Sequence, residues 1–331
     1  MSPYASAHAS PQGPGDARPT AIQIIKDEAA EGKLVGKVIV ITGVSSGLGV
    51  ETARALSLTG ATLFLTARDL AKARSALAGF FDSSRMHLIK IDQSSLDSVR
   101  AAASEILAKT DKINILINNA GVMAVQNLEF TKDGHELQFG TNHLSHFLFF
   151  ELLKPALLAG VTPELNSRVV NVSSSGHMIS GINASDNYNF QQGGYSPWVA
   201  YGQSKTANIY MANEIERRYG SKGLHATSLH PGGIMTPLAR HLPADVVESM
   251  VANEEMGKRM KSAEQGAATT VWAAVSKQWE HTGGKYLDNY AETKLSKNET
   301  RQFATGHAKH AYDAEKAGRL WEDSLKLVGL A

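Results

Sequence analysis

A short apolar run at residues 38–41, Val-Ile-Val-Ile, leads into a glycine-rich turn and then into a helical pattern that ends near Gly60. This order predicts a strand, a turn and a helix. Comparable apolar runs follow, separated by helical stretches, at residues 62–66, 87–91, 113–117, 168–172, 224–229 and 285–287. Strands that are apolar on both faces must be covered on both sides, which requires parallel strands joined by helical crossovers. The sequence therefore predicts an α/β fold with a doubly wound parallel sheet.

The chain has 331 residues, of which 43% are hydrophobic, so it can bury a large core. No change of composition divides it after residue 36, and we expect one domain over residues 20–331. Residues 1–19 contain four prolines among Ala, Ser and Gly, a composition typical of a disordered tail. Ser262 and Gln265 form a possible capping box, and a last helix is expected over residues 312–327.

The net charge is +1 and the Lys and Arg residues are dispersed, so no basic stripe indicates a nucleic-acid partner. The chain has no cysteine, which excludes disulfides and fits a reducing, cytoplasmic compartment. The longest apolar region, residues 144–160, is interrupted by His146, Glu151 and Lys154. It is therefore expected to be a buried helix, and no membrane association is predicted.

The turn at residues 42–49 reads Thr-Gly-Val-Ser-Ser-Gly-Leu-Gly and precedes a helix. Glycines let the backbone approach a phosphate, and the helix directs its N-terminal N–H groups at the same anion. The residues expected to hold a dinucleotide here are Gly43, Ser45, Ser46, Gly47, Leu48 and Gly49. Two alternatives remain: a turn without a ligand, and the Gly-x-Ser-x-Gly nucleophile elbow of an α/β-hydrolase with Ser45 as nucleophile. The elbow is disfavoured because it needs an earlier sheet and an oxyanion-hole loop upstream.

The ends of the second and third strands carry further candidates for the cofactor site. Arg68 stands where it could bind a 2′-phosphate, which favours NADP over NAD. Asp69 follows it and is interpreted as the N-cap of the next helix rather than as a ribose ligand. Asp92, with Gln93 beside it, is placed to contact the adenine, and a simple cap or turn role for Asp92 is equally compatible.

Tyr201 and Lys205 are four residues apart on a predicted helix and therefore lie on one face. A unit charge about 4 Å from the phenol, at an effective dielectric constant of ~20, is worth roughly 4 kcal/mol. That energy would lower the tyrosine pKa from ~10 to about 7, a useful value for an acid–base catalyst. The spacing alone is common, so its significance depends on the accompanying motifs.

These motifs together resemble the short-chain dehydrogenase/reductase family over residues 34–328. They are the Thr-Gly-x-x-x-Gly-x-Gly turn, Asn-Asn-Ala-Gly at 118–121, the serines at 173–175, Tyr-x-x-x-Lys at 201–205 and His-Pro-Gly-Gly-Ile-Met-Thr at 230–236. Several details are similar to the retinol-dehydrogenase-like and WW-domain-oxidoreductase-like branch and its soluble fungal members. The resemblance implies a single Rossmann domain whose seven parallel strands have the order 3-2-1-4-5-6-7.

The resemblance places the catalytic set on Asn142, Ser174, Tyr201 and Lys205. Tyr201 would exchange a proton with the substrate oxygen, and Ser174 would hydrogen-bond that oxygen. Lys205 would lower the tyrosine pKa and hold the nicotinamide ribose, and Asn142 would anchor a water that links Lys205 to solvent. Ser175 remains an alternative to Ser174.

The resemblance also implies cofactor contacts from two loops. Asn118 belongs to the first loop and supports the sheet there. The contacts are expected from Asn119, Ala120, Gly121, Pro231, Gly232, Ile234 and Thr236, together with Tyr201 and Lys205. Thr236 would bond the nicotinamide carboxamide.

A long insert at residues 176–199 carries Tyr188, Phe190, Tyr195 and Trp198, which either wall the substrate pocket or pack the insert onto the body. Residues 237–262 are expected to form a mobile lid over the substrate. His143 and His146, three residues apart, are interpreted as packing residues, and no metal site is predicted.

The predicted activity is that of an NADPH-dependent carbonyl reductase, reversible as an alcohol dehydrogenase, acting on a moderately apolar ketone or aldehyde. The non-enzymatic alternative is an NADPH-binding regulator that has lost turnover. By resemblance, a homodimer or homotetramer would form through helices near residues 143–158 and 200–218.

Overall fold

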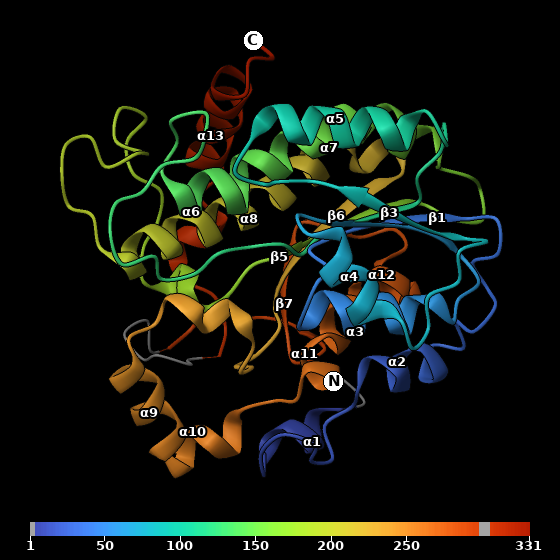
Figure 1. The fold of residues 1–331 in the computed structure, drawn as a ribbon, viewed down its shortest axis with the longest axis horizontal. Helices are drawn as coiled ribbons and strands as arrows, with labels where there is room; N and C mark the ends of the chain where they lie inside the picture. Colours follow the sequence, from blue (N-terminus) through green and yellow to red (C-terminus); the bar gives the residue numbers. More distant parts are fainter. Residues whose placement is uncertain (1–3, 298–304) are drawn as a thin grey trace.

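A computed structural model describes residues 4–297 and 305–331, and in these residues eight strands form one sheet of order β3-β2-β1-β4-β5-β6-β7-β8 (Figure 1). The strands are β1 Val38–Thr42, β2 Thr62–Ala67, β3 Met86–Lys90, β4 Ile115–Asn118, β5 Ser167–Val172, β6 Leu224–His230, β7 Lys285–Asp288 and β8 Ala291–Glu292. The predicted order of the first seven strands, all parallel, is confirmed. The predicted number of strands is corrected from seven to eight, because β8 pairs antiparallel with β7. This strand is only two residues long and follows a tight turn in which Asn289 and Tyr290 have positive φ, so no hydrophobic pattern announces it.

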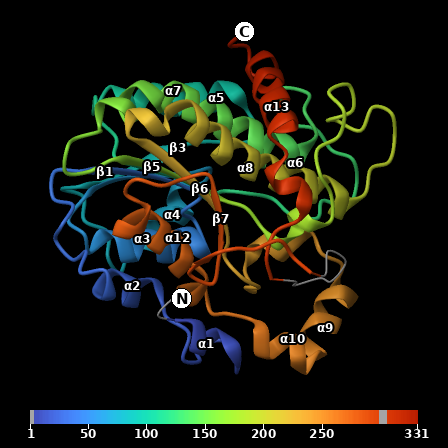
Figure 2. The same ribbon diagram turned by 180° about the vertical axis from the view of Figure 1, so that it is seen from behind.

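Helices cover both faces of the sheet, as the two views show (Figures 1 and 2). One apolar core lies between the sheet and α2 Ala21–Asp27, α3 Leu48–Ser57, α4 Leu70–Leu77 and α12 Ala268–Val275. The other lies between the sheet and α5 Leu96–Leu107, α7 Ser145–Ala159 and α8 Pro197–Tyr219. The fold is therefore the predicted doubly wound α/β architecture.

Parallel pairing brings the carboxyl ends of the central strands to one edge of the sheet. Thr42 pairs with Thr66, and Asn118 pairs with Asn171. The strand order reverses between β1 and β4, where β1 has β2 on one side and β4 on the other. In doubly wound sheets, ligands bind in the crevice at the carboxyl ends of the strands beside such a switch point.

The N-terminal segment differs from the expected disordered tail over the residues that the structure describes. It contains the short helix α1 Ala5–Ala9, and Arg18 is only 4% exposed. The Tyr4 and Tyr290 rings lie 4.9 Å apart, which joins the segment to the turn between β7 and β8. Its composition was misleading because the segment is held mainly by polar contacts and aromatic pairs rather than by aliphatic burial. Residues 1–3 lie outside the described residues.

The helix at the centre of the longest apolar region, α7, buries nine residues, as expected for a core helix. Within residues 4–297 and 305–331, no helix combines the length and the apolar character needed to cross a bilayer.

The predicted C-terminal helix is α13 Ala314–Leu327, which packs on α8 (Figure 2). Trp321 is 3% exposed, meets the Phe147 ring edge-on at 4.9 Å and lies 4.7 Å from the Arg218 guanidinium. The helix therefore covers part of the surface through which subunit association was predicted. Oligomeric state stays a prediction.

Replacing Trp321 by Ala should lower the free energy of unfolding by about 3–5 kcal/mol, because a large ring leaves a cavity between α7, α8 and α13. Urea denaturation measures this change. Leu330→Ala, at a side chain that is 40% exposed, is the control and should cost less than about 0.5 kcal/mol. Equal losses in the two variants would contradict the packing role of Trp321.

Candidate active site

The helix α8 carries Tyr201 and Lys205 on its buried face. It begins with Pro197 at its first turn, where a missing N–H costs nothing. Tyr201 is 3% exposed and Lys205 is 4% exposed. The Lys205 Nζ donates to the carbonyl oxygen of Val172 at 3.0 Å and lies 5.6 Å from the centre of the Tyr201 ring. The predicted proximity of the two side chains is therefore confirmed.

The predicted effect of Lys205 on the phenol is not found. Burial raises the pKa of Tyr201 to about 12, and a hydrogen bond with Ser174 lowers it by a smaller amount. Burial also lowers the pKa of Lys205 to about 8. The expected value assumed an ammonium about 4 Å from the phenol at an effective dielectric constant of ~20, with no cost for burying either group. Here the Lys205 Nζ donates to the Val172 carbonyl at the end of β5, and desolvation is the largest cause of both pKa shifts.

The three serines after β5 have different environments. The Ser173 Oγ donates to the backbone oxygen of Lys205 at 2.8 Å and is buried. Ser174 is the hydrogen-bond partner of Tyr201, and its Oγ also accepts from the Gly176 N–H at 3.0 Å. The Ser175 N–H donates to His230 Nδ1 at 3.1 Å. The choice of Ser174 over its neighbours is therefore supported by its contact with the phenol.

Asn142 lies in a π-helical turn, η1 Gly140–Leu144, at the start of α7. Single π turns inside helices are frequent at functional sites. Its side chain is fully buried, accepts from the Val122 N–H at 2.8 Å and donates to Ser204 Oγ at 2.9 Å. A Cβ on Gly121 would lie 3.0 Å from Asn142 Oδ1 and 3.6 Å from Lys205 Nζ. The Asn142 and Lys205 side chains therefore both lie beside Gly121. The water that Asn142 is predicted to anchor between Lys205 and solvent remains a prediction.

The glycine-rich turn lies against the end of β4. Gly43 has φ +79°, and a Cβ there would be 2.9 Å from the Cα of Ala120. A Cβ on Gly49 would overlap the carbonyl oxygen of Gly43 and lie 2.7 Å from Asn119 Nδ2. No side chain caps the N-terminus of α3, where Gly47 is the N-cap. The turn thus offers backbone N–H groups and close approach, which are what a dinucleotide phosphate requires.

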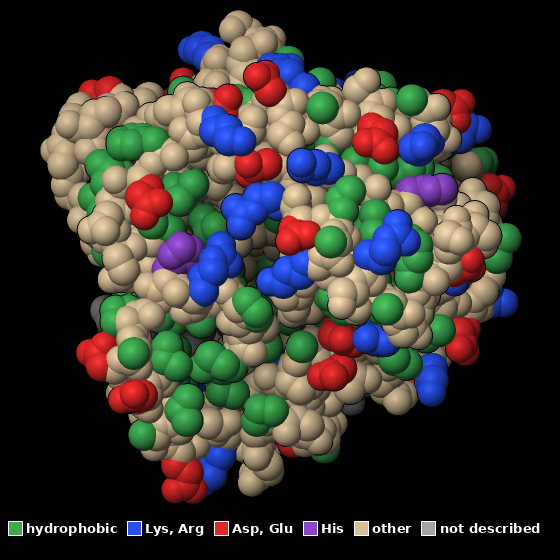
Figure 3. All heavy atoms as spheres, in the orientation of Figure 1, with side chains coloured by type: hydrophobic (Ala, Val, Ile, Leu, Met, Phe, Trp, Pro, Cys, Tyr) green, Lys and Arg blue, Asp and Glu red, His purple; other side chains and the backbone are tan. Residues whose placement is uncertain are grey.

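A cavity of about 700 Å³ opens at the carboxyl ends of the central strands. The face drawn in Figure 3 is hollowed near its centre, and Lys and Arg side chains gather around the hollow. Among the predicted site residues, those that line the cavity are Leu48, Asn119, Gly121, Ser174, Tyr201, Lys205, Pro231, Gly232, Ile234 and Thr236. The predicted site residues outside its lining are Gly43, Ser45, Ser46, Gly47, Gly49, Arg68, Asp92, Gln93, Ala120 and Asn142.

Three polar residues near the predicted adenosine end have other partners. Asp69 caps α4 by accepting from the Lys72 N–H at 2.9 Å, as predicted. Asp92 Oδ1 accepts from the Ser94 N–H at 3.0 Å, which is the alternative turn role. The Gln93 Nε2 lies 3.1 Å from His146 Nε2. A contact of Asp92 or Gln93 with adenine stays a prediction.

Most aromatic residues of the insert pack it onto the body. Tyr188 stacks on Phe139 at 5.2 Å, and the Tyr195 hydroxyl donates to the Val125 carbonyl at 2.6 Å. Phe190 meets Tyr195 edge-on at 5.4 Å within the insert. Of the four aromatic residues considered, only Trp198 lines the cavity, with its ring 6.0 Å from that of Tyr201. Trp198 therefore fits the interpretation of the insert as a pocket wall, and the other three aromatic residues fit the interpretation as packing.

The cavity wall includes residues of the expected lid as well as residues for which no role was predicted. The lid segment supplies Leu238, Ala239, Leu242, Met250 and Met260 to the cavity wall. Five methionines from separate parts of the chain line the cavity: Met123, Met178, Met235, Met250 and Met260. They have no common spacing, so no sequence signal joins them. His230 also lines the cavity, and burial lowers its pKa to about 3, so it is neutral there.

The histidines of α7 and its first turn are buried packing residues. The His143 Nε2 lies 2.9 Å from Ser324 Oγ, and the His146 Nε2 lies 2.9 Å from Thr42 Oγ1. Burial lowers the pKa of His143 to about 3 and of His146 to about 4. Both rings are therefore neutral near pH ~7.

Comparison with known proteins identifies the family. The model of the short chain dehydrogenase family matches residues 37–246. The chain belongs to the short-chain dehydrogenase/reductase family. It is 47% identical over 328 residues to short-chain dehydrogenase/reductase prx1 of Penicillium roqueforti, covering 99% of this chain and 95% of that protein. It is 34% identical over 300 residues to human retinol dehydrogenase 13, covering 89% and 85% of the two chains.

A solved structure of RhlG from Pseudomonas aeruginosa, an NADP active-site complex, matches this short-chain dehydrogenase/reductase with a TM-score of 0.62 and 25% identity. The match covers 78% of this chain and 96% of that one. The protein is thus an oxidoreductase of alcohol and carbonyl groups that uses a nicotinamide cofactor. The α/β-hydrolase interpretation of Ser45 is wrong.

The residues present in this short-chain dehydrogenase/reductase fit such a cofactor. The uncapped start of α3 and the close glycine contacts suit the phosphates of the cofactor. The cavity beside them is lined both by Leu48, at the start of α3, and by Lys205. When bound, the nicotinamide supplies or accepts a hydride.

Gly49→Ala should weaken binding of the nicotinamide dinucleotide at least about tenfold, because the added methyl group would displace the Gly43 carbonyl or the Asn119 amide. Titration of cofactor fluorescence measures the dissociation constant. Gly79→Ala is the control, since its nearest neighbour would be Arg54 Nη1 at 3.9 Å. Unchanged affinity in Gly49→Ala would show that the close approach is not needed for binding.

Proposed function

We propose that this chain is an NADPH-dependent carbonyl reductase, reversible as an alcohol dehydrogenase, with Tyr201 as its acid and base. One observation carries the proposal: the Tyr201 phenol, hydrogen-bonded to Ser174 and backed by Lys205, lies at the wall of a largely apolar cavity. This arrangement supplies a proton and a hydrogen-bond donor to an oxygen whose carbon accepts a hydride.

In the reduction direction, the phenol donates its proton to the substrate oxygen, and the Ser174 hydroxyl stabilises the negative charge that develops there. The Lys205 ammonium, close to Gly121 and Val172, would hold the nicotinamide ribose and stabilise the negative charge of the phenolate. The high pKa of Tyr201 that burial produces keeps the phenol protonated near pH ~7. It favours the acid over the base before any ligand binds.

The wall of the cavity supports a moderately apolar ketone or aldehyde as substrate. Its methionines are flexible and polarisable, so they adapt to apolar surfaces of different shapes. Ser174 and Tyr201 are polar residues of this wall, and together they would fix a single oxygen.

Two arginines support NADPH over NADH. Arg68 follows β2 and is exposed, whereas the Asp69 carboxylate is engaged as a helix cap. Arg240, in η4 Pro237–His241 of the lid, has its pKa lowered by burial and then by the positive charge of Arg68. Two guanidinium groups close enough to repel one another are suited to share the dianionic 2′-phosphate of NADPH.

Arg68→Ala should raise the dissociation constant of NADPH at least about tenfold and change that of NADH less than about threefold, since only NADPH carries the 2′-phosphate. Arg240→Ala should act in the same direction, more weakly. Isothermal titration measures both constants, with Arg74→Ala on the exposed face of α4 as the control. Equal losses for both cofactors would remove the support for NADPH.

Tyr201→Phe should lower carbonyl reduction by at least about a thousandfold while NADPH binding changes little, because only the transferable proton is lost. In the unmodified enzyme, alcohol oxidation should still be rising at the highest pH at which the enzyme stays folded, since it needs the deprotonated phenol, whose pKa burial raises to about 12. Full activity of Tyr201→Phe would reject the mechanism. NADPH binding without turnover in the unmodified chain, across a panel of carbonyl compounds, would support the regulator instead.

A further inference from the structure

The helices of the lid bury little surface that could hold the lid against the rest of the protein. It comprises η4, α9 Ala244–Ala252 and α10 Glu254–Arg259, and none of these three helices contains a buried residue. Segments with little buried apolar surface open at low cost in free energy. The position of the lid must therefore be fixed largely at its ends.

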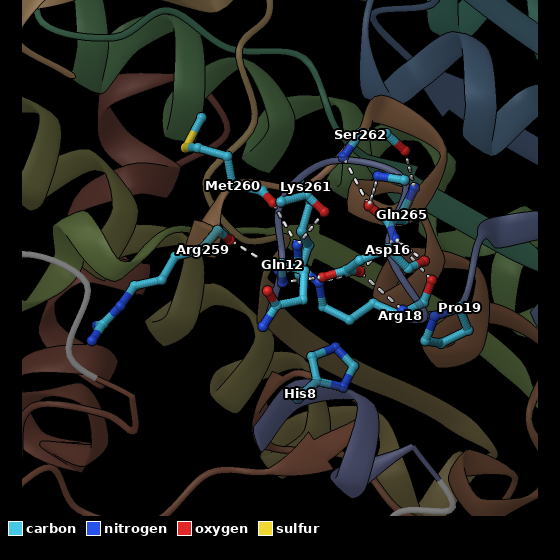
Figure 4. A network of polar contacts seen from close by, with 12 residues as sticks. His8, Gln12, Asp16, Arg18, Pro19, Arg259, Met260, Lys261, Ser262 and Gln265 are labelled. Atoms are coloured by element: carbon cyan, nitrogen blue, oxygen red, sulfur yellow. Dashed lines mark hydrogen bonds and ion pairs between the residues drawn. The ribbon is translucent and has the colours of Figure 1, made fainter. Parts of the chain in front are cut away.

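The C-terminal end of the lid is fixed by Arg18, which lies 241 residues away in sequence from Arg259. The Arg18 Nη1 donates to the Arg259 carbonyl oxygen at 2.9 Å, and its Nη2 donates to that of Met260 at 2.5 Å (Figure 4). These carbonyl groups end α10, where the helix itself provides no donors. The Arg259 side chain points away from the network in Figure 4, so the contact is made with the lid backbone.

Arg18 is itself oriented by buried partners. Its Nε pairs with Asp16 Oδ1 at 2.8 Å, and the two side chains are 3% and 9% exposed. Burial alone would raise the pKa of Asp16, but hydrogen bonds from Arg18 and from the Gln12 N–H lower it below its ordinary value. The pair is therefore ionised across the neutral range, and the guanidinium fork is fixed.

Gln265 joins the same segment to the helix after the lid. Its Nε2 donates to the Asp16 Oδ1 at 3.0 Å and to the Arg18 carbonyl at 2.9 Å. Its Oε1 accepts from the Gly15 N–H and from the Ser262 N–H, each at 3.0 Å. The second of these contacts belongs to the predicted capping box, which the structure confirms.

The opposite side of the segment is anchored to the sheet. The Tyr290 hydroxyl donates to the Pro19 carbonyl at 3.1 Å, and Tyr290 is 2% exposed. The N-terminal segment therefore bridges the β7–β8 turn and the end of the lid.

The clamp reaches the cavity through the next two residues. Met260 lines the cavity wall. Lys261 donates its backbone N–H to the Gly233 oxygen at 2.8 Å and its Nζ to the Pro231 oxygen at 3.3 Å. A Cβ on Gly232 would lie 2.8 Å from the Lys261 Cδ. Displacement of residues 260–261 would thus move both the Met260 side chain and the loop at residues 231–233 in the cavity wall.

We propose that Arg18 is a positioning residue, through which the N-terminal segment fastens the C-terminal end of the lid and sets the shape of the substrate side of the cavity. The kinetic form of this proposal rests on the proposed carbonyl reductase activity. The structural part of the proposal, that Arg18 holds the C-terminal end of the lid in place, does not depend on that activity.

Arg18→Met removes the fork and keeps the length of the side chain. In the full-length protein it should raise KM for the carbonyl substrate at least about tenfold, with kcat changed less than about threefold. The NADPH dissociation constant should rise less than KM does, because the glycine-rich turn and Arg68 still hold the phosphates and only the Pro231–Gly233 loop and the lid are displaced. Arg18→Lys, which restores the charge but not the fork, should recover part of the loss.

The matched control is Arg85→Met. Arg85 also pairs with an aspartate, Asp82 at 3.0 Å, and donates to a carbonyl, that of Ala61 at 3.2 Å, but at the opposite edge of the sheet. Because the Arg85 side chain is 30% exposed and that of Arg18 only 3%, urea denaturation of both variants measures how much stability each loses. Under conditions in which both remain folded, only Arg18→Met should change KM. Equal KM values in Arg18→Met and the unmodified protein, or an equal rise in Arg85→Met, would overturn the proposal.

Limited trypsin digestion tests the clamp without any substrate. Cleavage after Lys258, Arg259 and Lys261 should be at least about fivefold faster in Arg18→Met than in the unmodified protein and in Arg85→Met. Unchanged cleavage would overturn the clamp even if the protein reduces carbonyl compounds. Accelerated cleavage in a protein that reduces no carbonyl compound would uphold the clamp and reject the proposed function.

Discussion

Parallel pairing of β1, β4, β5 and β6 determines where chemistry can occur in this protein. Each of these strands ends at the same edge of the sheet, and the loop that follows each contributes to one cavity. Leu48, Gly121, Ser174 and Pro231 therefore meet although they are far apart in sequence. The helix α8, packed across β5 and β6, then brings Tyr201 and Lys205 to the same place. The site is a consequence of the topology, and the residue types give it a reaction.

Burial controls the electrostatics of that site more than pairing does. Tyr201 and Lys205 are both almost completely buried, and each is shifted toward its neutral form. A neutral phenol is a proton donor, so the protein alone prepares the acid needed for reduction. The base needed for oxidation requires stabilisation of a phenolate, which a fixed positive charge close to the phenol can provide. Lys205 is the candidate for this role, with its Nζ 5.6 Å from the centre of the Tyr201 ring.

The strands and the helix α8 could be predicted because their signals are local. Runs such as residues 38–41 are apolar on both faces, and Tyr201 and Lys205 are joined by the period of one helix. The turn glycines were predictable for the same reason, since the backbone there must approach Ala120. Features that depend on distant partners were not predictable. Arg18 is buried where it bonds to the Met260 carbonyl, far away in sequence. The strand β8 depends on a turn with positive φ at Asn289. The five methionines of the cavity wall come together only in the folded structure.

The two sides of the cavity differ in rigidity, and this difference has a physical origin. The cofactor side is built from strand ends and close glycine contacts, and at Gly43 and Gly49 an added methyl group would collide with backbone atoms. The substrate side is built from a lid without buried residues and from flexible methionine side chains. Such a wall tolerates different apolar shapes but selects poorly among them unless its ends are fixed. A polar clamp from the N-terminal segment fixes one end through the backbone carbonyl groups of Arg259 and Met260 and leaves the Met260 side chain in the cavity wall. Selectivity for the substrate can therefore be adjusted through residues that never touch it.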